Sequence, residues 1–217
     1  MATTKKTTPK DIVSAYMKHV LETGKMPESV YAFCKQNKMK EEEFYAHFGS
    51  FTGLQKGIWK AFYDNAHAVM HKQPDFENYS NKEKLLSLFF TLFEVFKANR
   101  SYILAAIEDE EKSLKSLKQL SELRKEIKMF TGSLLDERND ASKLKIQERN
   151  KVIFSEAAWL QFLFLMRFWL DDNSAGFEKT DIAIEKSVNT VFDLFETTPL
   201  ESLFDFSKFL WNERSMA

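Results

Sequence analysis

Two histidines are the first residues to examine for chemistry. His67 and His71 stand four residues apart with Asp64 one turn before them, a spacing that can hold a metal ion on one helix face. No further histidine or cysteine lies nearby in the sequence to complete a ligand set. We therefore expect these side chains to lie on an exposed or partner-facing surface, and we expect no metal and no cofactor.

Motifs that would carry catalysis are missing from the sequence. It has no glycine-rich phosphate loop, no nucleophile elbow and no HExxH motif. Its carboxylates stand beside lysines at helix-surface spacing, which is typical of a solvated face. The single Cys34 excludes a disulfide framework and a cysteine-based zinc site, and we expect it to be buried beside Phe33. The sequence therefore argues against an enzyme.

The elements that position any binding residues must be helices. Only 6 glycines and 4 prolines occur in 217 residues, whereas all-β folds need many turn residues. The 21 phenylalanines indicate either a thick apolar core or an internal cavity lined with rings. The net charge is −1, so any binding of nucleic acid must come from a local basic patch.

Apolar periodicity and capping signals predict where the helices lie. Thr8-Pro9 predicts the start of the first helix and Thr23-Gly24 its end. Further helices are predicted over residues 28–36, 40–47, 51–72, 85–97, 99–107, 150–170 and 178–196, with a last one from Thr198-Pro199.

The most apolar of these segments, 152–170, carries Glu156, Gln161 and Arg167. It therefore indicates a central core helix and no membrane span. The polar first ten residues indicate no signal peptide, and we expect the cytoplasm.

Residues 8–70 resemble the DNA-binding head of the TetR family. Two short helices flank the break at 37–39, and the run FYAHF at 44–48 is followed by Gly49-Ser50 and Leu54. The resemblance implies an all-α, TetR-like fold, with a three-helix helix-turn-helix head in 1–50 and a linking helix in 51–72. Residues 73–217 would then form a helical body that binds a ligand and dimerises.

The same resemblance implies DNA contacts by residues at the start of the first helix and around the recognition helix, namely Lys10, Lys38, Lys40, Glu42, Tyr45 and His47. This head departs from the family pattern, because Glu41 to Glu43 open the recognition helix and would face a polyanion. Residues 1–70 contain ten lysines, seven acidic residues and no arginine. We therefore expect weak, salt-dependent DNA binding, or a head kept for its shape that binds DNA poorly.

A second resemblance lies nearer the C-terminus. The run FWLDDNS at 168–174, followed by FEKT at 177–180, is similar to the lipid-binding proteins of ubiquinone biosynthesis. Those proteins share the TetR fold, have lost DNA binding and carry an isoprenoid-type lipid. The sequence thus leaves two functions open: a ligand-responsive transcriptional regulator, or a lipid-binding or lipid-presenting protein without DNA binding.

Both functions require an apolar ligand, a small molecule or a lipid, in the body. We expect a cavity between helices 85–97 and 150–170, lined by Phe89, Phe93, Phe96, Phe162, Met166 and Trp169. Arg167 would meet a polar head group at its mouth or, alternatively, pair with Asp171. We also expect a homodimer whose interface includes an apolar stripe of helix 178–196, formed by Ile184, Val188, Val191 and Phe195.

Overall fold

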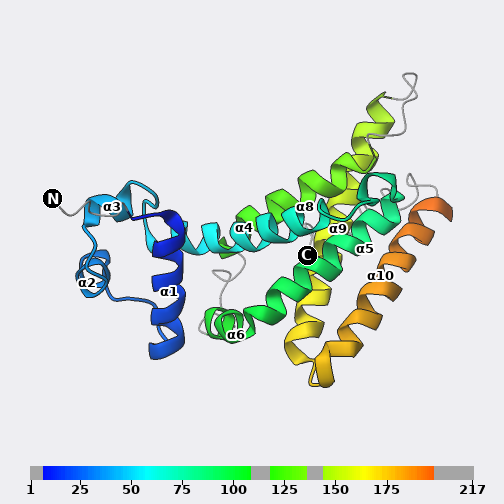
Figure 1. Cartoon of the computed structure of the whole chain (residues 1–217). Helices are drawn as coiled ribbons and strands as arrows, with labels where there is room; N and C mark the ends of the chain where they lie inside the picture. The colour runs from blue at the N-terminus through cyan, green and yellow to red at the C-terminus, as the bar shows by residue number, and fades with distance from the viewer. Residues whose placement is uncertain (1–6, 109–117, 136–143, 198–217) are drawn as a thin grey trace, which may run out of the picture. The chain divides into compact units, whose positions relative to one another are not determined.

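The computed structural model describes residues 7–108, 118–135 and 144–197. Every regular element in these ranges is a helix, nine α-helices and two 3-10 helices (Figure 1), which confirms the predicted all-α fold. The chain divides into two compact units, one formed by residues 1–69 and 91–126 and the other by 70–90 and 127–217. The division into head, linking helix and body stays a prediction.

The first unit begins with four helices, α1 (Pro9–Thr23), α2 (Val30–Gln36), α3 (Glu41–Tyr45) and α4 (Phe51–Met70), of which α4 ends one residue inside the second unit. α1 starts where predicted, because the Thr8 hydroxyl accepts a hydrogen bond from the Asp11 N–H while the Asp11 carboxylate accepts one from the Thr8 N–H. It ends at Gly24, whose φ of 67° is left-handed. α2 starts two residues later than predicted, because Ser29 caps it by accepting from the Ala32 N–H.

A cluster of aromatic rings holds α1, α2 and α3 on the start of α4. Phe33 makes edge-to-face contacts with Phe44 and Phe51, at ring-centroid distances of 6.2 and 5.6 Å. Tyr16 of α1 packs on the same Phe51 ring at 5.6 Å. The inner side of each short helix is therefore fixed by one buried ring, and its outer side is left to solvent.

The rest of the first unit comprises the second half of α5 (Asn81–Ala98), α6 (Arg100–Glu108) and the start of α8 (Ser121–Ser133). α6 packs against α1. Trp59 of α4 is fully buried beside Phe96, and its indole N–H donates to the Gln119 Oε1 at 2.9 Å. Gln119 in turn donates to the Ala106 carbonyl, so a satisfied buried amide joins α4 to α6.

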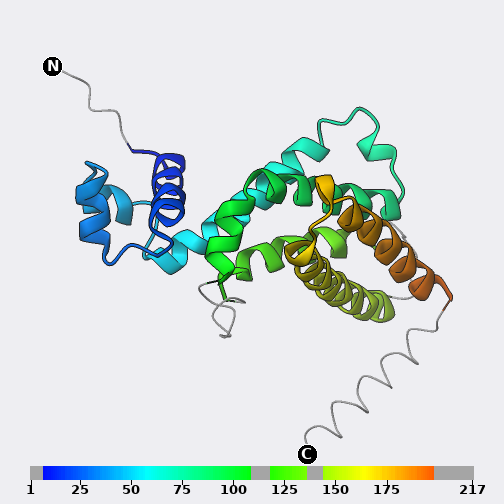
Figure 2. The ribbon, with the colours of Figure 1, turned by 90° about the horizontal axis from the view of Figure 1, so that it is seen from below.

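The second unit is built on α9 (Leu144–Asp171) and α10 (Glu178–Thr197), which lie side by side in both views of the ribbon (Figures 1 and 2). The short helices η1 (Phe76–Asn78) and η3 (Ala175–Phe177) also belong to it. In α9, Lys151–Asp171 is long and apolar enough to cross a membrane by length and composition, and half of that window is buried. The core helix of a soluble protein passes the same test of length and composition.

Asp172 marks the predicted stop between α9 and α10. Its carboxylate accepts hydrogen bonds from the N–H and hydroxyl groups of both Ser174 (2.8 and 2.7 Å) and Thr180 (2.9 and 2.7 Å). Burial alone would raise the pKa of this carboxyl, but the four hydrogen bonds outweigh it and lower the pKa to about 2. Asp172 therefore caps the start of α10. The helix predicted from Thr198 lies outside the described residues.

Candidate nucleic-acid interface and an apolar groove

The outer face of α3 and the turn before it form the candidate nucleic-acid interface. Phe44 is fully buried in the ring cluster, whereas the next residue, Tyr45, is 52% exposed. Glu42 and His47 are also exposed, as are Lys38 and Lys40 in the turn. Five of the six residues predicted to contact DNA thus share one short exposed segment. The sixth, Lys10, is exposed at the start of α1.

The turn between α2 and α3 holds Lys38 in a strained conformation. Lys38 has a φ of 54°, in the left-handed region that favours glycine and costs other residues about 1–2 kcal/mol. The turn is fixed on both sides, because the Met39 N–H donates to the Cys34 carbonyl at 3.0 Å and the Asn37 side chain donates to the Phe33 carbonyl. A lysine at this position places its charge outside the turn, at the approach to α3.

The sequence suggested that Glu41, Glu42 and Glu43 all face solvent, but the Glu43 carboxylate is held by hydrogen bonds within the protein. One carboxylate oxygen accepts from the Lys40 N–H and the other from the Thr7 hydroxyl, both at 2.8 Å. The Lys40 bond first, and then the Thr7 bond, lower the pKa of Glu43. Glu43 therefore ties the residues before α1 to the first turn of α3. Glu41 is half-buried, which leaves Glu42 as the exposed acid of this turn.

α2 adds two exposed residues that the sequence analysis missed. Tyr31 is 62% exposed, and the Lys35 ammonium lies 6.0 Å from the centre of its ring. An aromatic residue on the polar side of a short helix, four residues before a lysine, was the available signal. Cys34 is buried as predicted, and burial, with smaller contributions from Glu41 and Glu43, raises the pKa of its thiol.

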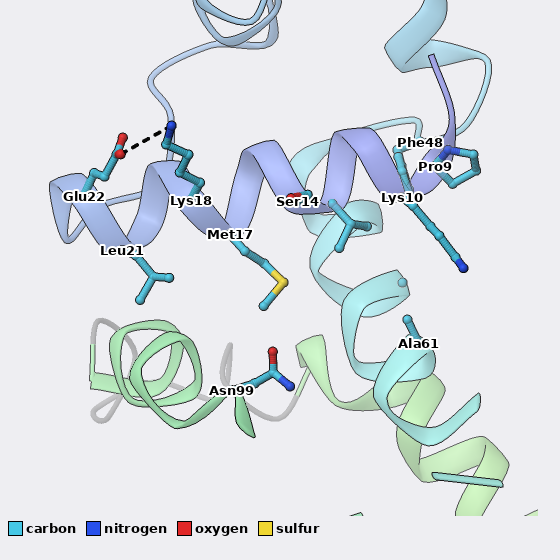
Figure 3. A pocket seen from close by; sticks show the side chains of 12 residues that line it. Pro9, Lys10, Ser14, Met17, Lys18, Leu21, Glu22, Phe48, Ala61 and Asn99 are labelled. Atoms are coloured by element: carbon cyan, nitrogen blue, oxygen red, sulfur yellow. Dashed lines mark ion pairs between the residues drawn. The ribbon is translucent and has the colours of Figure 1, made fainter. Parts of the chain in front are cut away.

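A groove of about 820 Å³ follows one side of α1 in the same unit (Figure 3). Met17 points from α1 toward Asn99 and Leu21 leaves the same side of α1 one turn later, while Ala61 lies on the α4 side. Gly57 makes room for the Phe48 ring, because a Cβ at this position would lie 3.0 Å from the Phe48 Cε1 atom. The complete lining consists of Pro9, Lys10, Val13, Ser14, Met17, Lys18, Leu21, Glu22, Phe48, Gly57, Ala61 and Asn99.

The residues predicted to line a ligand cavity in the body are all buried apart from Arg167, but they fall in two units. Phe89 and Phe162 are in contact in the second unit, with ring centroids 6.4 Å apart, and Met166 and Trp169 are buried in that unit as well. Phe93 and Phe96 belong to the first unit, where Phe96 packs on Trp59. The ligand cavity stays a prediction.

Arg167 adopts the alternative arrangement that the sequence left open. Its Nε atom lies 3.1 Å from the Asp171 Oδ2, and both side chains are more than 60% exposed. An exposed pair of this kind adds little stability.

The apolar stripe of α10 requires a correction. Ile184 and Val188 are completely buried, because this side of α10 packs on α9 of the same chain, so neither residue is available to a partner. Val191 and Phe195 are half-buried, and the Phe195 ring contacts Phe154 at 5.0 Å. Large apolar residues on the outer surfaces of the two helices are instead exposed: Val152, Leu160, Phe164 and Phe168 of α9, and Ile182 and Leu194 of α10.

The two histidines at metal-binding spacing have other neighbours. The His67 ring stacks on Tyr63, with centroids 5.6 Å apart. The His71 Nδ1 lies 3.2 Å from the Glu77 Oε1, and its ring packs edge-on against Phe76. Among the described residues, no group of three or more His, Cys, Asp or Glu side chains is placed to hold a metal ion.

Comparison with known families adds a finding for the larger part of the chain. Residues 84–210 match the family model described as tetracyclin repressor-like, C-terminal domain. The match spans more than half of the chain, and it covers the region where the sequence had offered only a general helical layout and one short motif. Comparison with curated proteins gave no match.

Proposed function

Because the chain belongs to the tetracyclin repressor-like (TetR) family, we propose that it is a ligand-responsive transcriptional regulator of the cytoplasm. It binds a DNA operator through the head and a hydrophobic ligand in the body. One observation carries the proposal: α3 buries Phe44 in the ring cluster and presents Tyr45, with the nearby lysines of the turn, to solvent. This is the arrangement by which a helix-turn-helix offers its second helix to the major groove.

The chemistry of this surface suits phosphate contacts better than base reading. Lys38, Lys40 and Lys10 supply point charges for the backbone, and the Tyr45 hydroxyl can donate to a phosphate oxygen. The head contains no arginine, which is the side chain that most often recognises guanine by two hydrogen bonds. We therefore propose that counterion release supplies most of the affinity, and that binding weakens steeply as salt rises.

We propose that the regulator acts as a homodimer joined through the outer faces of α9 and α10. Leu160, Phe164 and Phe168 follow one another at intervals of four residues, so they form one stripe along α9. Leu160 and Phe164 are 65% and 57% exposed, which is a large apolar surface to leave in water. In a dimer, ligand binding in the body would favour a spacing of the heads that no longer matches two half-sites one DNA turn apart.

Selection of sequences from a random DNA pool by the full-length protein tests the DNA-binding function. Fluorescence anisotropy then measures the affinity for the selected duplex over a range of salt concentrations. We expect an enriched, two-fold symmetric site and a loss of affinity in Tyr45→Ala. Lys125→Glu, which changes an exposed charge on α8 away from both proposed surfaces, serves as the control and should bind normally. Absence of any enriched sequence at low salt would contradict the regulator.

The alternative is a TetR-fold protein that binds or presents lipid and does not bind DNA. The exposed Glu42 beside Glu41 favours this alternative, because both acids lie in the first turn of α3, where DNA phosphates would approach. Extraction of the purified protein, followed by mass analysis, would identify a co-purified lipid. A stoichiometric lipid together with no DNA binding at low salt would establish the alternative.

A further inference from the structure

The groove along α1 has the shape of a site for one extended molecule. Its wall on α1 is a stripe at helical spacing, in which Val13, Met17 and Leu21 follow Lys10. From Lys10 to Leu21 the helix rises about 16 Å. The facing side is formed by small residues of α4, Gly57 and Ala61, and the volume of about 820 Å³ lies within the range of small-molecule sites.

The charges around the groove are not balanced. Lys18 and Glu22 form an ion pair at 3.7 Å and point away from Met17 and Leu21 (Figure 3). Lys10 extends from the start of α1 toward α4, on the same side of the helix as the apolar stripe. Since these are the three charged residues of the lining, the groove carries a net positive charge at its Lys10 end. The rest of that side is apolar apart from Ser14 and Asn99, and the Asn99 amide already donates to the Val95 carbonyl.

We propose that this groove binds a single-chain amphiphile with a carboxylate head, that is, a free fatty acid. The acyl chain lies along Val13, Met17 and Leu21, and the carboxylate meets the Lys10 ammonium. A length of about 16 Å suits a medium-length chain such as that of dodecanoate. The site is separate from the body ligand of the proposed function and does not depend on DNA binding.

Three features favour this occupant. The apolar surface is hollowed between helices, which fits a single chain better than the flat surface of a membrane. Met17 in the middle of the stripe adapts to a flexible chain, because its side chain has three rotatable bonds. The single net positive charge at one end selects an anionic head over a cationic one.

Titration of the full-length protein with dodecanoate below its micelle concentration tests the proposal, with calorimetry for affinity and the methyl signal of Met17 as a local readout. The Met17 signal is assigned from its loss in Met17→Leu. We expect binding that moves the Met17 signal and that weakens at least tenfold in Ala61→Phe, which fills the groove. Ala68→Phe, at an exposed position further along α4, should bind dodecanoate as the unmodified protein does.

The head group is tested separately. Lys10→Gln, at an exposed position that should not affect folding, is expected to weaken dodecanoate binding about fivefold. Dodecyltrimethylammonium has the same chain with the opposite charge, and it should bind at least fivefold more weakly than dodecanoate. The proposal is overturned if Ala61→Phe binds dodecanoate normally, if the Met17 signal does not move, or if both amphiphiles bind equally. A failure to bind DNA affects none of these readouts.

Discussion

Two helices of this protein, α3 and α9, have similar inner faces and opposite outer ones. α3 buries the Phe44 ring and α9 buries the Phe162 ring, each with no exposed surface. Outside, α3 presents charged residues and a tyrosine, whereas α9 presents Leu160, Phe164 and Phe168. The inner face makes each helix part of a core, and the outer face determines the kind of partner. A charged face suits reversible, salt-sensitive contacts, and an apolar face suits a long-lived protein interface.

The largest expected effect comes from placing a charge on the inner side of the α9–α10 pair. Val188→Glu should lower the free energy of unfolding by about 3–5 kcal/mol, because it leaves an unpaired charge in the core. Urea denaturation followed by circular dichroism measures this change. Glu185 and Lys186 are exposed neighbours, and Lys186→Glu is the control that should leave stability within about 0.5 kcal/mol. A folded, stable Val188→Glu protein would show that α10 does not pack on α9 as described.

A charge on the outer side should separate protomers without unfolding them. Phe164→Glu places a carboxylate in the exposed apolar stripe, so the dissociation constant of the dimer should rise at least a hundredfold, while the circular dichroism spectrum stays unchanged. Analytical ultracentrifugation measures the constant, with Lys125→Glu, at an exposed position on α8, as control. A wild-type protein that is monomeric at micromolar concentration would contradict the proposed dimer.

Removal of the Asp172 carboxylate should loosen the connection between the two helices. Asp172→Ala leaves the Ser174 and Thr180 donors without their acceptor, and we expect a loss of about 1–3 kcal/mol in the free energy of unfolding. Asp171→Ala breaks an exposed ion pair and should cost less than about 1 kcal/mol. Thermal denaturation of both variants measures these losses of stability. Equal losses in Asp172→Ala and Asp171→Ala would contradict the capping role of Asp172.

The pH dependence of the Asp172 effect follows from its lowered pKa. The carboxyl has a pKa of about 2 in the folded protein against an ordinary value of 3.8, so its contribution is fully present above 3.8 and is lost as the pH falls through about 2. The difference in stability between the unmodified protein and Asp172→Ala should therefore shrink between these two pH values. A difference that stays constant from pH 4 to about 2 would contradict this assignment.

Charge reversal on the turn before α3 should weaken DNA binding at least tenfold. Lys38→Glu and Lys40→Glu each remove a phosphate partner and add a repulsive charge, and each should reduce the salt dependence of log K by about one unit or more. Anisotropy titrations at several salt concentrations measure both quantities. Lys38→Gly isolates the charge from the backbone strain, because glycine accepts the φ of 54° without cost. It should bind DNA weakly and yet be at least as stable as the unmodified protein.

The smallest expected effect is a gain. Glu41→Ser combined with Glu42→Lys should strengthen DNA binding severalfold, because it removes two negative charges from the first turn of α3 and adds a positive one. Glu43→Gln is the informative control: Glu43 holds Lys40 and Thr7, so its neutralisation should not strengthen binding in the same way. Nanomolar, sequence-specific binding by the unmodified protein at physiological salt would contradict the weak head that we propose.

Local signals in the sequence predicted both ends of α1 and the start of α10, whereas α5 begins four residues earlier and α9 six residues earlier than predicted. α1 begins at a capping box and ends at a left-handed glycine, and both depend only on residues within one turn. The error at α2 is of the same local kind, because Ser29 was counted inside the helix that it caps.

Properties that depend on contacts between elements were not accessible from the sequence. The periodicity of Ile184 and Val188 correctly indicates an apolar face, but it cannot say whether α9 of the same chain or a second chain covers that face. The hydrogen bond from Thr7 to Glu43 joins residues 36 apart. The sequence therefore could not indicate that this bond turns the Glu43 carboxylate away from the outer face of α3. The groove along α1 likewise requires three separate elements to meet.

The labelling rate of the single thiol of the chain can report how often the head opens locally. Cys34 is a residue of α2 with 2% of its surface exposed, so a thiol reagent can reach it only when the head opens. The ratio of its labelling rates in the unfolded and native protein then measures the free energy of that local opening. Since no other cysteine occurs, this labelling reports on the head without labelling α9 or α10. A DNA duplex that binds α3 should slow the labelling of Cys34.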